Sequence, residues 1–471
     1  MANENFYLTT TLPYVNASPH IGFALEITEA DVIARYQRLL GNHVFFNTGT
    51  DEHGQKIYQK AISQEIEPQA YCDDWAAQFA DLKQQLNLSY DNFIRTTDPH
   101  HQTAAQHFWE KSLANGDIYQ AQYEIKYCVG CELEKTEKEL ENGKCPLHPD
   151  QELELREEEN YFFKFSKYQQ PLLKFYRNNP EFVKPAGKMK EVIAFVEQGL
   201  KDFSISRLKT KMPWGIPVPN DSNQVMYVWF DALINYISTL GWPDKDSQYD
   251  QYWPGIQLAG KDNLRQQAAM WQAMLMSVKL PNSKKILING FINVDGQKMS
   301  KSLGNVISPQ EMVARYGIDG TRYLLISLGS FNEDTDVSWR KFDERYTADL
   351  ANGLGNLCSR VAKMAANENL TYTTKKIKMS SLLKQHLDSY DLSAGLKEII
   401  NFISLADGFL SKQQPWKKQG QEKNEILTTV IDKIHEIAFD LQPFMPSTAA
   451  KIQAHFQDQI QPLTPMFPRL I

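Results

Sequence analysis

The sequence predicts an α/β protein: a doubly wound parallel sheet with a small insert, followed by an all-α bundle. An apolar and Thr-rich stretch from Phe6 to Leu12, a helical run and a second strand from Val44 to Asn47 form a β-α-β unit. Three cysteines and a histidine gather in the middle of the chain at metal-ligand spacing. Beyond about Tyr346, apolar residues recur at helical spacing.

The first helix of the β-α-β unit begins at Pro19-His20-Ile21-Gly22-Phe23. Its apolar positions share a helical period until Gly41 ends the run: Ile21, Leu25, Thr28, Val32, Tyr36 and Leu39. His20 therefore lies at the N-terminal end of a helix, where free N–H groups attract anions. Thr50-Asp51-Glu52-His53-Gly54 follows the second strand and precedes another helix. Both loops fall at strand C-termini, where open parallel sheets bind ligands.

The most informative loop is Lys298-Met299-Ser300-Lys301-Ser302, which lies between Gly296 and Gly304. Two lysines three residues apart on a flexible loop can close over a polyphosphate and neutralise charge during phosphoryl or nucleotidyl transfer. A solvated basic loop is the alternative for such a string taken alone. The two N-terminal motifs favour the functional interpretation.

The metal-ligand pattern is Cys128-x2-Cys131, thirteen residues, then Cys145-x2-His148. Paired ligands on tight turns are typical of a tetrahedral zinc knuckle, and four protein ligands would leave no open position, so the role would be structural. A loop with free thiols is the alternative. Cys72 and Cys358 lie outside this cluster and are expected to be ordinary buried thiols.

Bulk properties restrict the class of protein. The chain has 471 residues, of which 42% are hydrophobic, enough for two or three domains with cores of their own. No apolar run is long enough to span a membrane, and the first residues resemble neither a signal nor a transit peptide. We expect a cytoplasmic protein. The formal charge of −7 argues only weakly against a polyanion partner, because local patches determine such contacts.

The predicted organisation has four segments. Residues 1–115 form the first half of the doubly wound domain. Residues 116–224 form an insert with small antiparallel strands, such as Tyr123 to Tyr127, around the knuckle. Residues 225–345 resume the nucleotide fold with the apolar run Val225 to Phe230 and continue through Ile286 to Ile288 to the Lys298 loop. Residues 346–471 form the helical bundle.

Two patterns in the predicted bundle are informative: the first suggests a surface that binds a partner, and the second a face that packs in the core. Asn352, Asn356 and Arg360 are spaced i, i+4, i+8, so they share one helix face, while apolar residues occupy another. A wet surface would explain the same pattern. A later stripe is most simply a core face, and its members are Ile426, Val430, Ile434, Ile437 and Leu441.

Taken together, the motifs resemble those of class I aminoacyl-tRNA synthetases, of which His-Ile-Gly and Lys-Met-Ser-Lys-Ser are the two signatures. Further motifs resemble the methionyl-tRNA synthetase family in its order: Leu12-Pro13-Tyr14, Thr50 to Gly54, Tyr227 to Ala232 and Gly260-Lys261-Asp262. The resemblance covers nearly the whole chain. It implies a Rossmann-like class I catalytic domain and a ligase that activates L-methionine with ATP and transfers it to tRNA(Met).

The resemblance also implies residue roles. His20, Lys298 and Lys301 would be catalytic, and ATP with its Mg²⁺ would lie against His20, Gly22, Phe23, Asp262, Lys298, Ser300 and Lys301. Asp51 would hold the substrate ammonium in a methionine pocket formed with Leu12, Tyr14, Trp229, Ala232, Leu233, Tyr236, Asn263 and Gln267. Asn352, Asn356 and Arg360 would read the CAU anticodon, and Trp416, after Pro415, would stack on a base. Zn²⁺ would be structural.

Two positions depart from the family pattern. Phe23 stands where the first signature normally ends in a second histidine, and Gln267 stands where a histidine usually closes the back of the methionine pocket. Asn263 adds a polar group where an aliphatic is common. A catalytically weakened tRNA-binding paralogue is therefore an alternative hypothesis. A cysteine enzyme of the same class is a third, disfavoured because the cysteine cluster lies in the insert. We expect a monomer.

Overall fold

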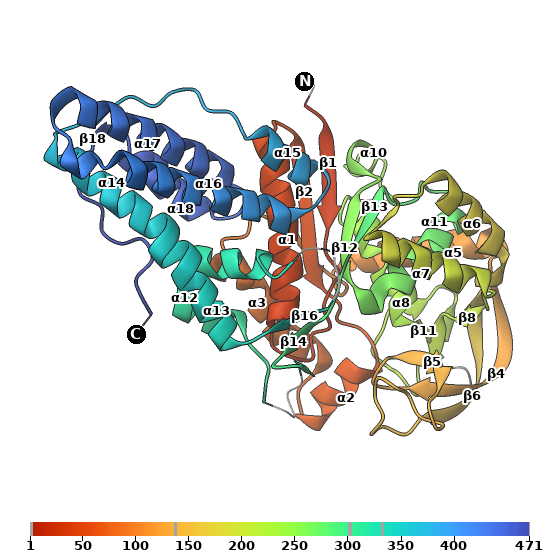
Figure 1. Cartoon of the computed structure of the whole chain (residues 1–471). Coiled ribbons are helices and arrows are strands. Elements are labelled where there is room, and N and C mark those ends of the chain that lie inside the picture. Colours follow the sequence, from red (N-terminus) through yellow and green to blue (C-terminus); the bar gives the residue numbers. More distant parts are fainter. Residues whose placement is uncertain (1–2, 136–138, 300–303, 330, 332–333, 471) are drawn as a thin grey trace.

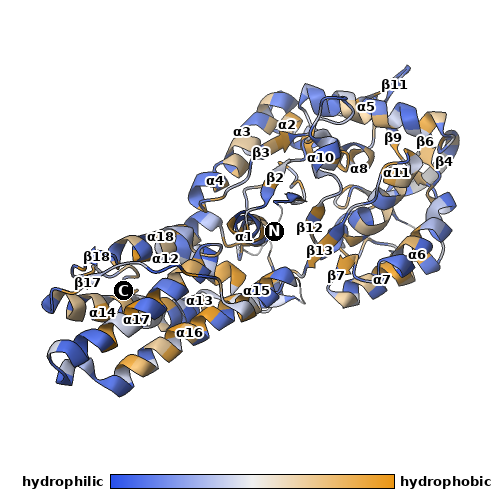
Figure 2. Ribbon diagram, turned by 90° about the horizontal axis from the view of Figure 1, so that it is seen from above, coloured by the Kyte–Doolittle hydropathy of each residue, from blue (hydrophilic) through white to orange (hydrophobic). Residues whose placement is uncertain are grey.

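The structure is a computed structural model that describes residues 3–135, 139–299, 304–329, 331 and 334–470. A central sheet separates the helical bundle on one flank from the insert on the other (Figure 1). Seen from above, the bundle extends away from the sheet, so the molecule is elongated (Figure 2). Among the described helices, none combines the length and apolar character needed to cross a membrane.

The central sheet has six strands in the order β3-β2-β1-β12-β13-β7, and every neighbouring pair is parallel. The order reverses between β1 and β12, which makes the carboxyl ends of these two strands the expected ligand site. The strands are β1 (Asn5–Thr9), β2 (His43–Thr50), β3 (Asn92–Arg95), β7 (Val183–Lys184), β12 (Ile256–Gly260) and β13 (Lys285–Asn289). The predicted doubly wound fold is confirmed.

Helices cover both faces of this sheet, because residues along each strand point alternately to two cores. Leu8, Leu258 and Leu287 point into one core, and Tyr7, Ala259 and Ile288 into the other. The first core is built with α1 (Ile21–Leu39), α2 (Gln55–Ser63), α3 (Pro68–Ala80), α4 (Leu82–Gln85) and α12 (Pro309–Ile326). The second includes residues of α5 (Pro99–Ala114), α6 (Gln169–Asn178), α7 (Ala186–Glu197), α8 (Val228–Ala232), α9 (Asn235–Ser238), α10 (Tyr249–Tyr252) and α11 (Trp271–Ser277).

Two predicted strands in this region have the wrong bounds. β1 ends at Thr9 rather than Leu12, because the Thr11 N–H donates to the Glu26 carboxylate (2.7 Å) instead of to a neighbouring strand. The run Val225 to Phe230 is not a strand of the central sheet. It contains the end of β11 (Asp221–Met226) and the start of α8, and β12 is the next strand of the central sheet along the chain.

The insert is antiparallel, as predicted, but its strands are longer than expected. β4 (Ile118–Cys128) pairs along its length with β6 (Glu154–Phe163), and the sheet is completed by β5 (Leu133–Lys135) and β8 (Phe203–Ser204). A second small sheet pairs β11 with β9 (Ser206–Leu208) and β10 (Pro217–Val218). A third contains the start of the Lys298 loop, in β14 (Ile292–Val294), β15 (Gln297–Lys298) and β16 (Thr335–Val337).

The C-terminal part is helical from α13 (Trp339–Arg345) onward, apart from the short pair β17 (Thr371–Tyr372) and β18 (Asp458–Gln459). The bundle helices are α14 (Asn356–Asn367), α15 (Ser381–Asp388), α16 (Leu392–Gln413), α17 (Gly420–Leu441) and α18 (Pro446–His455). The predicted stripe on α17 faces the core: Val430, Ile434, Ile437 and Leu441 are buried, and Ile426 is half-buried.

One buried arginine side chain joins the bundle to the catalytic half of the molecule, through its hydrogen bonds rather than through its ion pair. The guanidinium of Arg322, on α12, lies 2.7 Å from the Asp31 carboxylate of α1. It also donates to the carbonyl oxygens of Leu86, Pro443 and Phe444, so its donors are shared between both parts of the chain. His20 lies at the N-terminal end of α1. The bundle is therefore linked, through Arg322, to the helix that begins at the predicted site.

Candidate active site, metal centre and partner surface

The N-terminus of α1 has the predicted geometry. His20 is its N-cap, and the ring Nδ1 accepts a hydrogen bond from the Gly22 N–H (3.0 Å). A Cβ at Gly22 would lie only 2.8 Å from the His20 ring, so glycine is required for this close approach. The Ile21 N–H donates to the Ile307 carbonyl (3.1 Å), which lies just beyond the Lys298 loop. The two signature segments therefore meet at this helix end.

Lys298 lies near this junction. Its ammonium is 5.0 Å from the centre of the Phe291 ring, and the ammonium of Lys261 is 4.2 Å from the same centre. Lys261 is also paired with Asp334 (2.6 Å). The carboxylate of Asp262 experiences the positive charges of both Lys298 and His20. Ser300 and Lys301, also predicted to contact ATP, lie outside the described residues.

Asp51 follows β2 and is bridged to Tyr14, since the Val15 N–H donates to the Asp51 carbonyl (3.3 Å) and the Asp51 N–H to the Pro13 carbonyl (3.0 Å). Its side chain is only 3% exposed, and among the described residues its Oδ1 has no hydrogen-bond partner. Burial, followed by the negative charges of Asp231 and Glu132, raises the pKa of Asp51 well above its usual value. A buried carboxylate in this state is suited to pair with an incoming cation.

Asp231, near the end of α8, is held between two buried histidines. His53 Nδ1 lies 2.6 Å from one carboxylate oxygen and His101 Nε2 lies 2.8 Å from the other. Burial alone would raise the pKa of Asp231, but His53 and His101 outweigh it and hold the pKa below its usual value. This network ties α8, which carries Trp229, to the loop that carries Asp51.

Predicted methionine-pocket residues lie on α8, on α9 and on a later π-helix. Their surroundings are buried and largely aromatic. Tyr236 is buried, and its hydroxyl accepts a hydrogen bond from the Gln267 amide on a π-helix (Gln266–Met270). Tyr7 supports the Tyr236 backbone, because its hydroxyl donates to the Tyr236 carbonyl (2.8 Å). Ala232 and Leu233 are also buried, while Leu12, Tyr14, Trp229 and Asn263 are half-buried.

Among the predicted pocket residues on these helices, two carry a buried polar atom with no partner among the described residues: the indole N–H of Trp229 and the amide oxygen of Gln267. Buried polar groups are normally satisfied, and a polar ligand is one way to satisfy them. The Gln267 amide nitrogen donates to the Tyr236 hydroxyl, so only the oxygen side of this amide is without a partner among the described residues.

Phe23 points into the core. Its side chain is 9% exposed and packs edge-to-face against Phe79 of α3, with ring centres 5.5 Å apart. The ring offers no donor to a phosphate. Although Phe23 is predicted to contact ATP, its observed surroundings are those of a core side chain.

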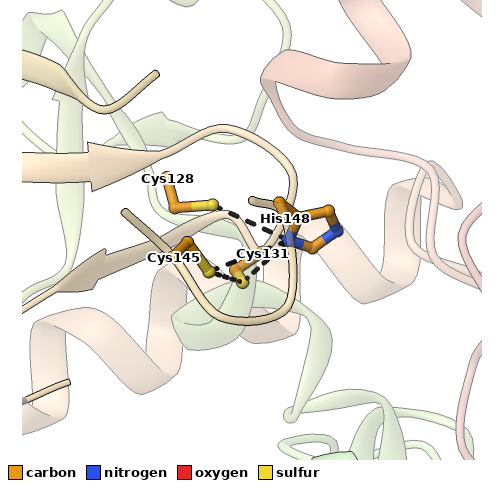
Figure 3. A group of neighbouring side chains, drawn as sticks. All are labelled: Cys128, Cys131, Cys145 and His148. Atoms are coloured by element: carbon orange, nitrogen blue, oxygen red, sulfur yellow. Dashed lines mark hydrogen bonds between the residues drawn. The ribbon is translucent and has the colours of Figure 1, made fainter. Parts of the chain in front are cut away.

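The predicted knuckle ligands converge (Figure 3). Cys128, Cys131, Cys145 and His148 place their ligand atoms within 4.8 Å of one another. The sulfur of Cys131 is 3.4 Å from that of Cys145 and 3.2 Å from the His148 Nδ1. Tetrahedral zinc with three sulfurs and one nitrogen would need edges of about 3.5–3.8 Å, so this donor set fits zinc.

The protonation of His148 is consistent with a metal ligand. Burial, with the nearby positive charges of Lys56 and Lys298, lowers the pKa of His148 below its usual value. A neutral imidazole is the form that binds metals. The two remaining thiols behave as expected: burial raises the pKa of Cys358 to about 12, and Cys72 is buried beside the Glu52 carbonyl.

The predicted partner surface on the bundle is only partly regular. Asn352 lies in a π-helix (Tyr346–Gly355), whereas Asn356 and Arg360 lie on α14, so the expected uniform α-helical spacing is wrong at Asn352. Both asparagines are exposed. The Arg360 guanidinium pairs with Asp407 (2.7 Å) and lies 5.7 Å from the centre of the Trp416 ring. Trp416 is 47% exposed, as predicted for a stacking platform.

Comparison with known proteins agrees with this arrangement. The family model described as tRNA synthetases class I (M) matches residues 6–152 and 131–362. The methionine–tRNA ligase of Thermosynechococcus vestitus is 42% identical, over 96% of this chain and 89% of the relative. That of Rickettsia bellii is 41% identical, over 96% and 92%. The chain belongs to the methionyl-tRNA synthetase family.

Solved structures of the family share the whole fold. The Mycobacterium tuberculosis methionyl-tRNA synthetase in complex with methionyl-adenylate superimposes with a TM-score of 0.91 at 33% identity, covering 99% of this chain and 100% of that one. The apo form of the same protein gives a TM-score of 0.83 at 30% identity, covering 100% and 99%. The predicted fold class is thereby confirmed, including the helical C-terminal part.

Several residues that shape the site were not singled out from the sequence. His101 and Asp231 belong to the buried hydrogen-bond network with His53, and the sequence indicated Asp231 only as part of the motif Tyr227 to Ala232. The Glu26 carboxylate accepts hydrogen bonds from the Thr11 backbone N–H (2.7 Å) and from the Thr11 hydroxyl (2.6 Å). Glu132 follows the second knuckle cysteine and contacts Tyr14.

Proposed function

We propose that this chain is an active methionine–tRNA ligase. The observations that carry the proposal lie in the loops that follow β1 and β2: the His20 helix end, whose charge acts on Asp262 together with that of Lys298, and the buried Asp51 Oδ1, which has no partner among the described residues. In the first step, a methionine carboxylate oxygen attacks the α-phosphorus of ATP. The bond to pyrophosphate breaks, and methionyl-adenylate forms.

We assign the residue roles as follows. Asp51 pairs with the methionine ammonium, because its Oδ1 is buried and has no hydrogen-bond partner among the described residues. His20 and the N–H groups behind it hold the triphosphate, and Lys298 and Lys301 neutralise the departing pyrophosphate. Mg²⁺, when bound with ATP, would supply further stabilisation of charge on the phosphates. No covalent enzyme intermediate is required, so positioning and charge stabilisation supply the catalysis.

The pocket residues would hold the thioether. All eight are buried or half-buried: Leu12, Tyr14, Trp229, Ala232, Leu233, Tyr236, Asn263 and Gln267. A thioether packs well against aromatic rings and makes only weak hydrogen bonds. The Tyr236 hydroxyl, oriented by Gln267, is the polar group best placed to contact sulfur.

In the second step, a hydroxyl of the terminal adenosine of tRNA(Met) attacks the methionyl carbonyl, and AMP leaves. Asn352, Asn356, Arg360 and Trp416 would contact the anticodon, supported by the exposure of Trp416 beside Arg360. Zn²⁺ at the knuckle would hold the insert in shape. We propose the domain boundaries 1–115, 116–224, 225–345 and 346–471, a monomeric state and a cytoplasmic location.

ATP–pyrophosphate exchange with a panel of amino acids tests the proposal. Exchange with methionine, and far less with leucine, isoleucine or cysteine, would support it. Asp51→Asn should abolish most of the exchange, and Asp246→Asn, the same change at an exposed position, should leave it intact. Folded protein that binds tRNA(Met) but exchanges with no amino acid would instead identify a weakened paralogue.

A further inference from the structure

Glu132 directly follows a knuckle cysteine, yet its carboxylate lies in the active-site region. The residue is 1% exposed and has a left-handed backbone (φ 48°), which is uncommon for a non-glycine residue. Its N–H closes a turn with the Val129 carbonyl (3.3 Å). The turn that carries Cys131 therefore also directs Glu132 away from the ligand cluster.

The Glu132 carboxylate joins two segments on either side of Asp51. Oε2 accepts a hydrogen bond from the Tyr14 hydroxyl (2.8 Å), and Oε1 accepts one from the Lys56 N–H in the first turn of α2 (2.9 Å). Helix α2 has Gly54 as its N-cap and no side-chain cap of its own, so Glu132 caps it from another element. A Cβ at Gly54 would lie 2.7 Å from Oε2, so the carboxylate is packed against the backbone.

A second contact fixes the base of the knuckle against the pocket. The Arg207 guanidinium is buried between the rings of Tyr127 and Tyr227, 5.2 and 4.3 Å from their centres. Tyr127 precedes Cys128, and Tyr227 is the N-cap of α8, which carries Trp229. The base of the knuckle is thus held by packing, whereas its tip reaches the pocket through Glu132.

We propose that Glu132 is a positioning residue that makes methionine binding depend on the folded, metal-bound knuckle. It fixes the Tyr14 hydroxyl and the first turn of α2, and these two segments flank Asp51. The inference rests on the proposed function, because it assumes that Asp51 and Tyr14 contact methionine. Glu132 itself does not contact the substrate.

Methionine binding without ATP, measured by titration calorimetry on the full chain, tests this role. Glu132→Ala and Glu132→Gln should each raise the dissociation constant, by about tenfold for Ala, as expected for a lost hydrogen bond to a charged group. The metal content should stay at the wild-type level. Glu152→Ala, at an exposed glutamate of the same insert, is the matched control and should bind normally.

A double-mutant cycle separates positioning from general damage. If Glu132 acts through the Tyr14 hydroxyl, Tyr14→Phe and Glu132→Ala combined should weaken binding by less than the product of the single effects. Independent, fully multiplicative effects would overturn the proposal. Removing the metal with a chelator should weaken methionine binding to the wild type and change the affinity of Glu132→Ala much less.

The outcomes distinguish the two proposals. Wild-type protein that binds no methionine would refute the proposed function itself. Wild-type protein that binds methionine, together with Glu132 variants that bind it equally well, would refute only the role of Glu132. Loss of metal in both Glu132 variants would also refute it, because the carboxylate would then serve the knuckle rather than the pocket.

Discussion

Replacing Asp51 by asparagine should weaken the activity and strengthen the unliganded fold. Asp51 is buried, its Oδ1 has no partner among the described residues, and burial with Asp231 and Glu132 raises its pKa well above the usual value. A group bound to a proton in the folded state and ionised in the unfolded state contributes stability below its ordinary pKa. That stability is lost as pH rises.

The magnitudes follow from the burial of the charge. At neutral pH, Asp51→Asn should raise the free energy of unfolding by about 1–3 kcal/mol, because the neutral amide does not need the proton that the buried carboxyl must bind on folding. The same change removes the counter-ion of the methionine ammonium. Leaving one partner of a buried ion pair unpaired costs about 3–5 kcal/mol, so kcat/KM for exchange should fall roughly 10²–10³-fold or more.

Thermal unfolding between pH 5 and 8, with and without methionine, measures both effects on one protein. A ligand at a hundred times its dissociation constant stabilises the wild type by about 2.7 kcal/mol, and Asp51→Asn should lose most of this gain at the same concentration. Asp246→Asn should match the wild type throughout. An Asp51→Asn protein that is less stable without ligand, or that keeps the methionine-dependent stabilisation, would refute the reasoning.

Three further predictions concern residues away from Asp51. Phe23→His should lower the free energy of unfolding by about 1–3 kcal/mol in urea titrations, because Phe23 packs against Phe79. The rate of ATP–pyrophosphate exchange should rise little. A large rise in that rate would mean that the side chain at position 23 reaches the phosphates. Trp416→Ala should raise the KM for tRNA(Met) and leave exchange intact, with Trp416→Phe intermediate; equal damage to both steps would make Trp416 structural. Burial raises the pKa of Glu26 from 4.5 to about 8. The free energy of unfolding of the wild type should therefore fall as pH rises from 4.5 to about 8, and Glu26→Gln should reduce this fall. Parallel profiles of unfolding free energy against pH for the two proteins would contradict the prediction.

Local sequence patterns predicted the elements that local physics determines. The helix after His20 was predicted from its apolar period and its terminating glycine, and it runs from Ile21 to Leu39. The knuckle was predicted from spacing alone, because paired ligands on tight turns constrain the backbone locally. The strand bounds were less accurate, since Thr11 leaves the ladder to bind Glu26, a residue fifteen positions away.

The run Val225 to Phe230 shows why strand identity was harder to predict. Its residues are nearly all buried, which an apolar pattern correctly indicates. Burial does not distinguish a strand of the central sheet from the junction of a strand in a smaller sheet and a short helix. Asp231 forms hydrogen bonds to His53 and His101 from distant segments. Those contacts become visible only once the chain has folded.

Residues proposed to touch ligand and residues that hold them in place thus differ in how readily the sequence reveals them. Residues proposed to touch ligand, such as His20 and Asp51, lie in short motifs because the loop geometry that aims them is local. Residues that hold them, such as Arg322 and Glu132, act across long sequence separations and carry no motif of their own. Phe23 illustrates the consequence: a motif position can change while the elements that converge on the site remain in place, because α1 is anchored by Asp31 and Arg322 rather than by that side chain.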